Sequence, residues 1–470
     1  MKRKILSWIV AASMVFAMVP AGAMASSNTN VTGVPAGENI AIDEVNFPDV
    51  NFRNMILNNY DENKDKVLSP DEIANTTEIW CGLEDLTDLT GIEYFTALKK
   101  LECPANSIKK IDVSALKDLE CLDCSNNDFT EIDLSQNTKL KELNLFESKL
   151  TKLPLEDVPE LEKLSFGNDK ISTVDFSKTP NLTVINIYNS PLKTLDLSPL
   201  KNLDTLEIYA TPLTKLSLVG NPKLKILRCS SNKLKSIDLS KNNLLDTLEC
   251  EDNDITSLNL RNNPKLFTLS CSNNDIRSLD LNNNKNLHEI ACSNTKISHL
   301  NLPDCTDPFS SSVSDNVYTV TGPVVNYQKL PANFNVNKIR NLKGGILNKK
   351  NKTITFNNSN TITYTYRIGN MWESVFKIKT TAFSKQKVLN VKTTSGVGNV
   401  RVNFNKVKNA TGYKIAYKKV GTKNFKYIKV KNNSFTLRKL MRHKKYEIKV
   451  CALKGNVQSY YSKSVFRVTK

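Results

Sequence analysis

The sequence predicts an α+β chain built around a long solenoid with a parallel β-sheet, with a small helical cap before it and two all-β sandwich modules after it. Three observations predict this architecture. A 21-residue apolar period covers nearly half of the 470 residues. Cysteines recur with the same period, and a lysine-rich segment with short alternating apolar stretches ends the chain.

The apolar period runs from Leu101 to Ile290 without a slip, and every twenty-first residue between them is Leu or Ile. A constant period of about 20 to 29 residues with apolar residues in fixed phase is typical of leucine-rich repeats. One repeat cannot bury its own apolar edge, so neighbouring repeats must stack and share a core. We therefore predict a solenoid over residues 79–303, whose 21-residue period stops at Cys305.

Cysteines stand two residues after many of the stepping positions. Side chains two apart on a strand point the same way, so these thiols should face inward. In-register neighbours lie nearly 5 Å apart, slightly wide for a disulfide, and a linear row does not supply a tetrahedral zinc site. We predict a ladder of reduced thiols, with some bridging or metal binding as the alternative. The ladder is Cys81, Cys103, Cys124, Cys229, Cys250, Cys271 and Cys292, while Cys121, Cys305 and Cys451 lie off it.

Asparagines such as Asn127 and Asn274 occupy the start of the turn that leaves the strand in the end repeats. An asparagine amide there can satisfy backbone groups of a tight turn. The middle repeats carry other residues at this position, so we expect their turns to be looser; these residues are Ser148, Asp169, Ser190 and Thr211.

Repeats such as 269–281, with Leu269, Cys271, Asn274 and Ile276 in phase, resemble the internalin-like secreted leucine-rich repeat proteins of Gram-positive bacteria. They are most similar to the members that carry a cysteine ladder. The resemblance covers about 225 residues. It implies the solenoid fold and says much less about the ligand.

The net charge of +18 is unevenly distributed. Residues 386–470 hold about 22 Lys and Arg against 1 acidic residue, whereas residues 1–305 hold about 32 against 43. This division favours an acidic solenoid with a basic tail over a nucleic-acid-binding protein.

Residues 1–25 have the features of a signal peptide, with a basic start, an apolar core from Ile5 to Val19 and an Ala-x-Ala cleavage site. Residues 26–37 are a polar tether. No later run is apolar enough to span a bilayer, and no Leu-Pro-x-Thr-Gly sorting signal is present. We expect a secreted or extracellular protein, with non-covalent attachment to the cell wall as an open alternative.

Residues 38–78 predict a helical cap, which a solenoid needs to cover its exposed first repeat. The cap contains an EF-hand-like spacing of oxygen-bearing residues, which predicts a structural Ca²⁺ site. Lys66 stands where this loop prefers glycine. The alternative is therefore a calcium-free cap in which Ser69 and Glu72 form a capping box. The predicted ligands are Asp61, Asn63, Asp65, Val67, Ser69 and Glu72.

The middle repeats place large apolar and aromatic residues on the solvent side of the strands. A contiguous exposed aromatic patch is typical of an interaction site, whereas ordinary repeat drift is the alternative. Nearby acidic residues such as Glu207 and Glu249 would favour a basic or amine-bearing partner. The predicted partner-binding residues are Phe146, Val184, Tyr188, Tyr209 and Ile226.

Residues 304–385 alternate like short strands and resemble the β-sandwich that follows the repeats in the same bacterial proteins. Residues 386–470 resemble a fibronectin type III module, in which Leu440 and Tyr446 have the spacing of a tyrosine corner. The lysines of this module predict attraction to an anionic cell-wall polymer or an acidic glycan.

No motif brings a nucleophile and a base together around His288, His299 or His443, so we predict no enzyme. The predicted function is protein binding on the concave face of the solenoid, as a monomeric adhesin or surface interaction protein. Glycan binding by Tyr188 and Tyr209 is the alternative, and a purely structural spacer is the third hypothesis.

Overall fold

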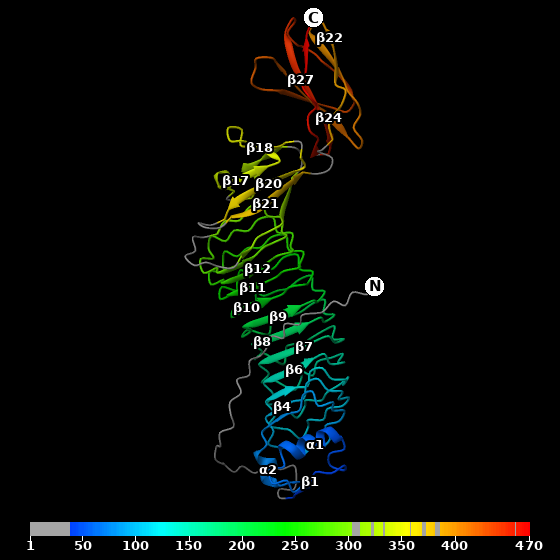
Figure 1. Cartoon of the computed structure of the whole chain (residues 1–470), viewed down its shortest axis with the longest axis vertical. Helices are drawn as coiled ribbons and strands as arrows, with labels where there is room; N and C mark the ends of the chain where they lie inside the picture. Colours follow the sequence, from blue (N-terminus) through cyan, green and yellow to red (C-terminus); the bar gives the residue numbers. More distant parts are fainter. Residues whose placement is uncertain are drawn as a thin grey trace.

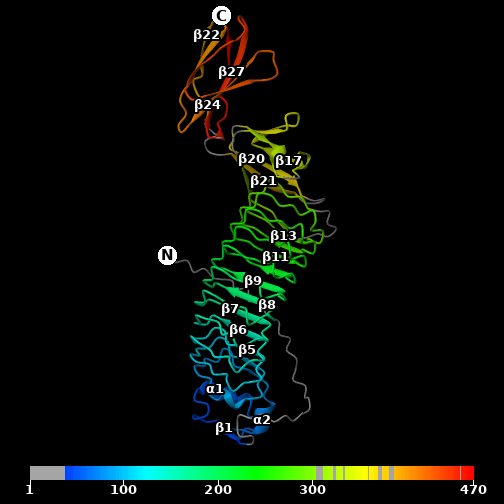
Figure 2. The ribbon, with the colours of Figure 1, turned by 180° about the vertical axis from the view of Figure 1, so that it is seen from behind.

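The computed structural model describes residues 38–302, 311–320, 324–331, 334–357, 359–368, 373–380, 386–455 and 457–470. The predicted signal peptide, the tether and Cys305 lie outside the described residues. The protein is elongated, with the cap at one end, the solenoid in the middle and two all-β units at the other end (Figures 1 and 2). The predicted fold class is confirmed. Among the described residues, no helix is both long and apolar enough to cross a membrane.

The cap is a helix–loop–helix whose loop pairs with the preceding segment in a small antiparallel sheet. The side chain of Asp49 accepts hydrogen bonds from two backbone N–H groups and starts the first helix. Ser69 and Glu72 form the predicted capping box at the second helix. The elements are β1 (Ile40–Ala41), α1 (Val50–Asn59), β2 (Val67–Leu68) and α2 (Pro70–Asn75).

The solenoid contributes one strand per coil to a parallel sheet of twelve strands. Strand partners lie one repeat apart, as in the pair Leu122 and Leu143, so the stepping residues stack in a single buried row. The strands are β3 (Glu78–Trp80), β4 (Lys100–Glu102), β5 (Cys121–Asp123), β6 (Glu142–Phe146), β7 (Lys163–Gly167), β8 (Val184–Tyr188), β9 (Thr205–Tyr209), β10 (Ile226–Arg228), β11 (Thr247–Glu249), β12 (Thr268–Ser270), β13 (Glu289–Ala291) and β14 (Ser311–Ser312), with the short helix η1 (Ile92–Tyr94) after β3.

Buried asparagines join one coil to the next. The amide of Asn127 donates to the carbonyl oxygens of Cys103 and Cys124, as predicted for this turn. A second row of asparagines on the return leg was not anticipated from the sequence. In that row Asn242 is fully buried and donates to the carbonyl oxygens of Leu218 and Asn221. These amides satisfy backbone groups that would otherwise be buried without partners.

The expectation of looser turns in the middle repeats is wrong for the backbone. The residue four positions after the stepping residue has nearly the same left-handed φ at Glu147 (55°) as at Asn126 (52°) and Asp252 (53°). Each of these residues donates its N–H to a carbonyl oxygen of the next coil, at 2.6 to 3.1 Å. Because this backbone bond shapes the turn, loss of the following asparagine leaves its conformation unchanged.

The parallel sheet also extends past the point where the apolar period stops. Ser311 in β14 pairs with Ile290, 21 residues earlier, so the repeat register continues. Two further positions of the repeat reappear, because Val313 is buried where the ladder carries cysteine, and the buried Asn316 accepts a bond from the N–H of Thr295. Because a serine occupies the stepping position of this last coil, a search for apolar residues at that position does not find it.

Two all-β units follow, and the first shares its core with the solenoid. Buried residues from Ile42 to Ile378 form one hydrophobic cluster, so the unit covers the far end of the coils. One sheet has the order β15-β21-β20-β17 and the other β16-β19-β18. The elements are β15 (Asn316–Val320), β16 (Val324–Asn326), η2 (Tyr327–Lys329), η3 (Val336–Lys338), β17 (Ile339–Lys343), β18 (Gly345–Asn348), β19 (Thr353–Phe356), β20 (Thr361–Arg367) and β21 (Glu373–Thr380).

The last unit has a separate hydrophobic cluster from Val388 to Ala452. Its sheets are β22-β23-β26 and β25-β24-β27-β28, with β29 also paired to β27. The hydroxyl of Tyr446 accepts a bond from the N–H of Met441, the type of contact that the tyrosine-corner spacing predicts. The strands are β22 (Lys392–Gly396), β23 (Asn399–Asn403), β24 (Gly412–Lys419), β25 (Lys426–Val430), β26 (Ser434–Leu437), β27 (Lys445–Lys454), β28 (Val457–Gln458) and β29 (Val465–Val468). The fibronectin type III assignment stays a prediction.

Candidate partner-binding surface

Three of the five predicted partner-binding residues meet in one row on the solvent face of the parallel sheet. The rings of Tyr188 and Tyr209 stack at 5.3 Å with 14° between their planes. The ring of Phe146 meets Tyr188 edge-on at 5.7 Å. We call Phe146, Tyr188 and Tyr209 the aromatic row. Gly167 in β7 lies between the strands of Phe146 and Tyr188 and has no side chain, so these two rings meet across it.

An ionic network holds the tyrosine hydroxyls in place. Tyr188 donates to Glu207 at 2.7 Å, and Arg228 binds both Glu207 and Glu249. The hydroxyl of Tyr209 lies 3.5 Å from Glu249. The role of Arg228 was missed in the sequence, although Glu207, Arg228 and Glu249 occupy the same position of three successive repeats.

The aromatic row is half-buried rather than fully exposed. Burial, followed by the hydrogen bond to Glu207, raises the pKa of Tyr188 above its ordinary value. Burial and the nearby carboxylates also raise the pKa of Tyr209. Both hydroxyls therefore stay protonated at neutral pH. The row presents a fixed apolar surface with polar groups whose positions are already set, which lowers the entropy cost of binding.

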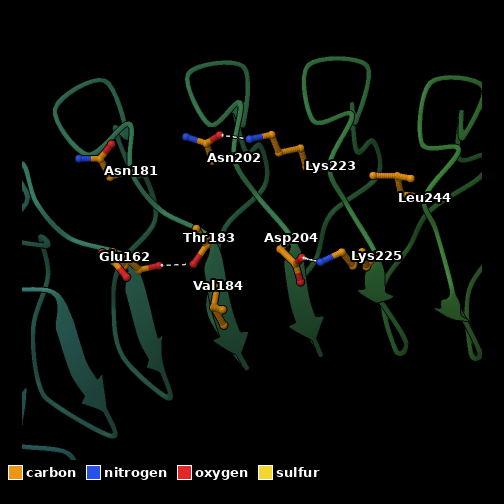
Figure 3. Close-up of a pocket in the computed structure, with 9 residues that line it drawn as sticks. All are labelled: Glu162, Asn181, Thr183, Val184, Asn202, Asp204, Lys223, Lys225 and Leu244. Carbon is orange, nitrogen blue, oxygen red and sulfur yellow. Dashed lines mark hydrogen bonds and ion pairs between the residues drawn. The ribbon is translucent and has the colours of Figure 1, made fainter.

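The other two predicted residues lie away from the row. Val184 stands four residues before Tyr188 on β8, and it lines an open groove with Thr183, Asp204 and Lys225 (Figure 3). Asp204 and Lys225 are ion-paired there. Ile226 lies at the same position as Val184, two repeats on. The structure therefore separates Val184 and Ile226 from the aromatic row.

The acidic residues around the row are ion-paired. Four glutamates near the row, including Glu207 and Glu249, each have a cationic partner. The pairs are Glu102 with Lys100, Glu142 with Lys163, and both Glu207 and Glu249 with Arg228. Three cations therefore serve four carboxylates, and the preference for a basic or amine-bearing partner stays a prediction.

The predicted calcium loop has part of the geometry that the ion needs. Lys66 has φ +65°, in the left-handed region where glycine is preferred, and its N–H donates to the buried Asp61. The carboxylate of Glu72 accepts bonds from the N–H groups of Glu62 and Ser69. Among the described residues, however, no three His, Cys, Asp or Glu side chains converge as a metal site. Hydrogen bonds within the cap satisfy the carboxylates of Asp61 and Glu72.

The ladder cysteines line the interior as predicted, and all are free thiols. Burial raises the pKa of Cys229 and of Cys271 to about 12, so both are protonated at neutral pH. Off the ladder, Cys121 is half-buried and Cys451 is buried, and both are also free. A thiol in this state is a poor nucleophile.

Two of the histidines pack against aromatic rings. His299 is buried, lies 3.0 Å from the hydroxyl of Ser298 and packs edge-on against Phe334 at the junction with the first all-β unit. His288 stacks on Phe267 at 4.9 Å near the end of the solenoid. Ser298 and His299 are both buried, so this serine–histidine contact is closed to solvent.

The coils, the parallel sheet and the inward ladders define the protein as a leucine-rich repeat solenoid. Its fold is similar to that of the functional domain of InlJ from Listeria monocytogenes, which includes a cysteine ladder, with a TM-score of 0.52 and 22% identity over 74% of this chain and all of that one. An internalin (InlF) from L. monocytogenes strain 4b F2365 aligns with a TM-score of 0.41 and 20% identity, over 59% of this chain and 98% of that one. The resemblance to internalin-like proteins is confirmed at the level of the fold.

The sequence comparisons cover shorter stretches. Internalin J of L. monocytogenes serotype 4b (strain F2365) is 34% identical over 68 residues, which span 14% of this chain and 7% of that protein. Residues 213–304 also match the family model of the anaphase-promoting complex subunit 4 WD40 domain. In the structure, residues 213–302 supply one parallel strand per coil, whereas a WD40 blade has four strands.

Proposed function

We propose that this chain is a non-enzymatic, exported bacterial protein that binds a protein partner on the solvent face of its parallel sheet. The aromatic row is the contact centre in this proposal. The observation that carries it is the stack of Tyr188 on Tyr209, whose hydroxyls contact the two glutamates that Arg228 binds. Rigid aromatic groups surrounded by satisfied polar groups are typical of energetic centres in protein interfaces.

The geometry of the rings favours a protein over a sugar at this site. A sugar binds to an aromatic side chain by lying flat on an open ring face. One face of Tyr188 is covered by Tyr209, and the ring also packs against Phe146. Tyr188 therefore offers mainly its ring edge and apolar side-chain surface, which suit the irregular contacts of a folded partner.

The test compares two pairs of stacked aromatic residues on the same solenoid. One variant carries Tyr188→Ala and Tyr209→Ala, and the control carries Phe267→Ala and His288→Ala, which removes the stacked pair at the far end. Cross-linked pull-downs from bacterial and host surface extracts would identify a partner, whose affinity is then measured with purified protein. Loss of the central pair should weaken binding at least tenfold, about 1.4 kcal/mol, while the control binds like the wild type.

Equal affinity of the two variants and the wild type would reject the aromatic row as the contact centre. A glycan that binds the purified chain and loses affinity only in the Tyr188 and Tyr209 variant would replace the protein partner with a sugar. Thermal unfolding of each variant confirms that the solenoid is intact.

We also propose that the cap loop binds Ca²⁺ in a structural role, which the left-handed Lys66 and the bond from its N–H to Asp61 support. To bind Ca²⁺, the carboxylate of Glu72 must give up hydrogen bonds and contact the ion instead. Addition of Ca²⁺, but not Mg²⁺, should raise the thermal unfolding midpoint, and Asp61→Asn should abolish the shift. Asp112→Asn, which changes an exposed carboxylate in a solenoid turn, should retain it. Identical midpoints with and without Ca²⁺ in the wild type would exclude the site.

A further inference from the structure

The outer face of the larger sheet in the last all-β unit carries a cluster of lysines. Residues that alternate with the buried ones on β24 and β27 point outward, and they include Lys414, Lys418 and Lys449. Lys429 on β25 pairs directly with Lys414, and Lys445 begins β27. We call these five residues the lysine face. Figure 1 places the sheet with β24 and β27 at the end of the molecule remote from the cap.

The lysine face has almost no compensating negative charge. Glu447 is the one acidic residue in 386–470, and it is shared by Lys418 at 3.4 Å and the hydroxyl of Ser464. Lys414 and Lys429 are cross-strand partners of the same charge. Like charges directly opposite each other destabilise a sheet. Such a surface is stabilised when a polyanion binds to it.

Aromatic rings hold these ammonium groups against the sheet. Lys418 and Lys449 both lie over the ring of Phe425, at 4.8 and 4.3 Å. Lys414 lies over Tyr427 at 4.5 Å. Cation–π contacts of this kind limit the side-chain motion that binding would otherwise have to restrict.

The same contacts define the chemistry of the ligand. Rings already covered by ammonium groups are poorly placed to stack on nucleic-acid bases or sugars. The lysine face contains no arginine, whose planar fork would select paired oxygens, and lysine binds phosphate as a point charge. Recognition on this face therefore depends on charge density and not on base or sugar shape.

We propose that the lysine face binds a linear phosphate-bearing polymer without bases, and that this contact is independent of the aromatic row. Charge neutralisation by several lysines in parallel supplies the affinity, so binding should weaken steeply with salt. A protein with this property has one surface for a protein partner and a second, separate surface for a polyanion.

The experiment uses the whole mature chain and fluorescent long-chain inorganic polyphosphate, with anisotropy measured over a range of NaCl concentrations. The test variant carries Lys414→Gln, Lys429→Gln and Lys449→Gln. The control carries Lys392→Gln, Lys406→Gln and Lys408→Gln, which removes the same charge from exposed positions of the same unit outside the lysine face.

The test variant should bind about tenfold or more weakly, and its slope of log affinity against log salt should fall by about 2, at roughly 0.7 per lost contact. The control should remain within about twofold of the wild type. Absence of polyphosphate binding, or equal losses in both variants, would overturn the proposal. Equal affinity for single-stranded oligo-dT, or for phosphatidylglycerol vesicles, with the same loss in the test variant would overturn it in favour of nucleic acid or membrane.

Discussion

A β-carbon placed on Gly167 would lie 2.1 Å from the carbonyl oxygen of Tyr188, and Gly167 has φ +156°. The absence of a side chain at this position thus allows β7 and β8 to pair with Tyr188 in its stacked position. The aromatic row depends on this glycine as much as on its own rings.

Gly167→Ala should destabilise the solenoid by about 1–3 kcal/mol, because a strained backbone and an overpacked contact must both be relieved. It should also weaken partner binding, since Tyr188 must move. Gly220→Ala is the control, because the β-carbon there would have a nearest contact of 3.3 Å and the backbone φ is ordinary. Urea unfolding measures both variants. Equal stability of the two variants would show that a side chain at position 167 causes neither backbone strain nor overpacking.

Arg228→Met should remove the cation that bridges Glu207 and Glu249. The side chain of Glu207 is only 10% exposed, so it would be left as a nearly buried carboxylate without its cation. We expect a loss of about 1–3 kcal/mol. Lys225→Met breaks the exposed pair with Asp204 and should cost less than about 1 kcal/mol. Chemical denaturation distinguishes the two, and a loss at Arg228 no greater than that at Lys225 would show that the network contributes little.

Cys250→Ser should be more destabilising than Cys250→Ala. The thiol is fully buried between coils, and burial raises its pKa well above the ordinary value, so the group is an apolar thiol in practice. A serine hydroxyl without a good partner at this position costs about 1–3 kcal/mol, whereas alanine leaves only a small cavity. Unfolding free energies from urea titration rank the two variants. A Cys250→Ser variant at least as stable as Cys250→Ala would contradict an apolar environment for the cysteine ladder.

The cap should become less stable in acid through Asp49. Burial acts to raise the pKa of this carboxyl, but hydrogen bonds from Thr87, Phe52 and Asn51 together hold it below its ordinary value. A pKa that is lower in the folded state gives stability above the unfolded pKa of about 3.9, and this stability is lost as pH falls through the folded pKa.

Asp49→Asn keeps a residue that can cap a helix but removes the titrating group. The variant should therefore show a smaller fall in thermal midpoint between pH 5 and strongly acidic solution than the wild type. The thermal midpoint of Asp157→Asn, a change at an exposed position, should fall as much as that of the wild type. The same acid sensitivity in all three proteins would assign the effect to other carboxyls.

The sequence predicted the features that repeat and missed those that depend on contact across repeats. The repeat positions of Leu122 and Cys250 alone predict that they are buried, because stacked coils place each repeat position in the same surroundings. Arg228 shares its repeat position with Glu207 and Glu249, but that position holds uncharged residues in several other repeats, so its bridging role follows only from the pairing of the strands. Ser311 interrupts the apolar pattern but keeps the backbone register. A search for periodic apolar residues therefore misses the last coil.

The final all-β unit has its own apolar cluster, separate from the one that runs from the cap to the end of the coils. Separate clusters unfold as separate cooperative elements. If the last unit bound a polymer while the coils bound a partner, the two attachments would lie on separate cooperative units. Unfolding of one unit would then leave the binding surface of the other intact.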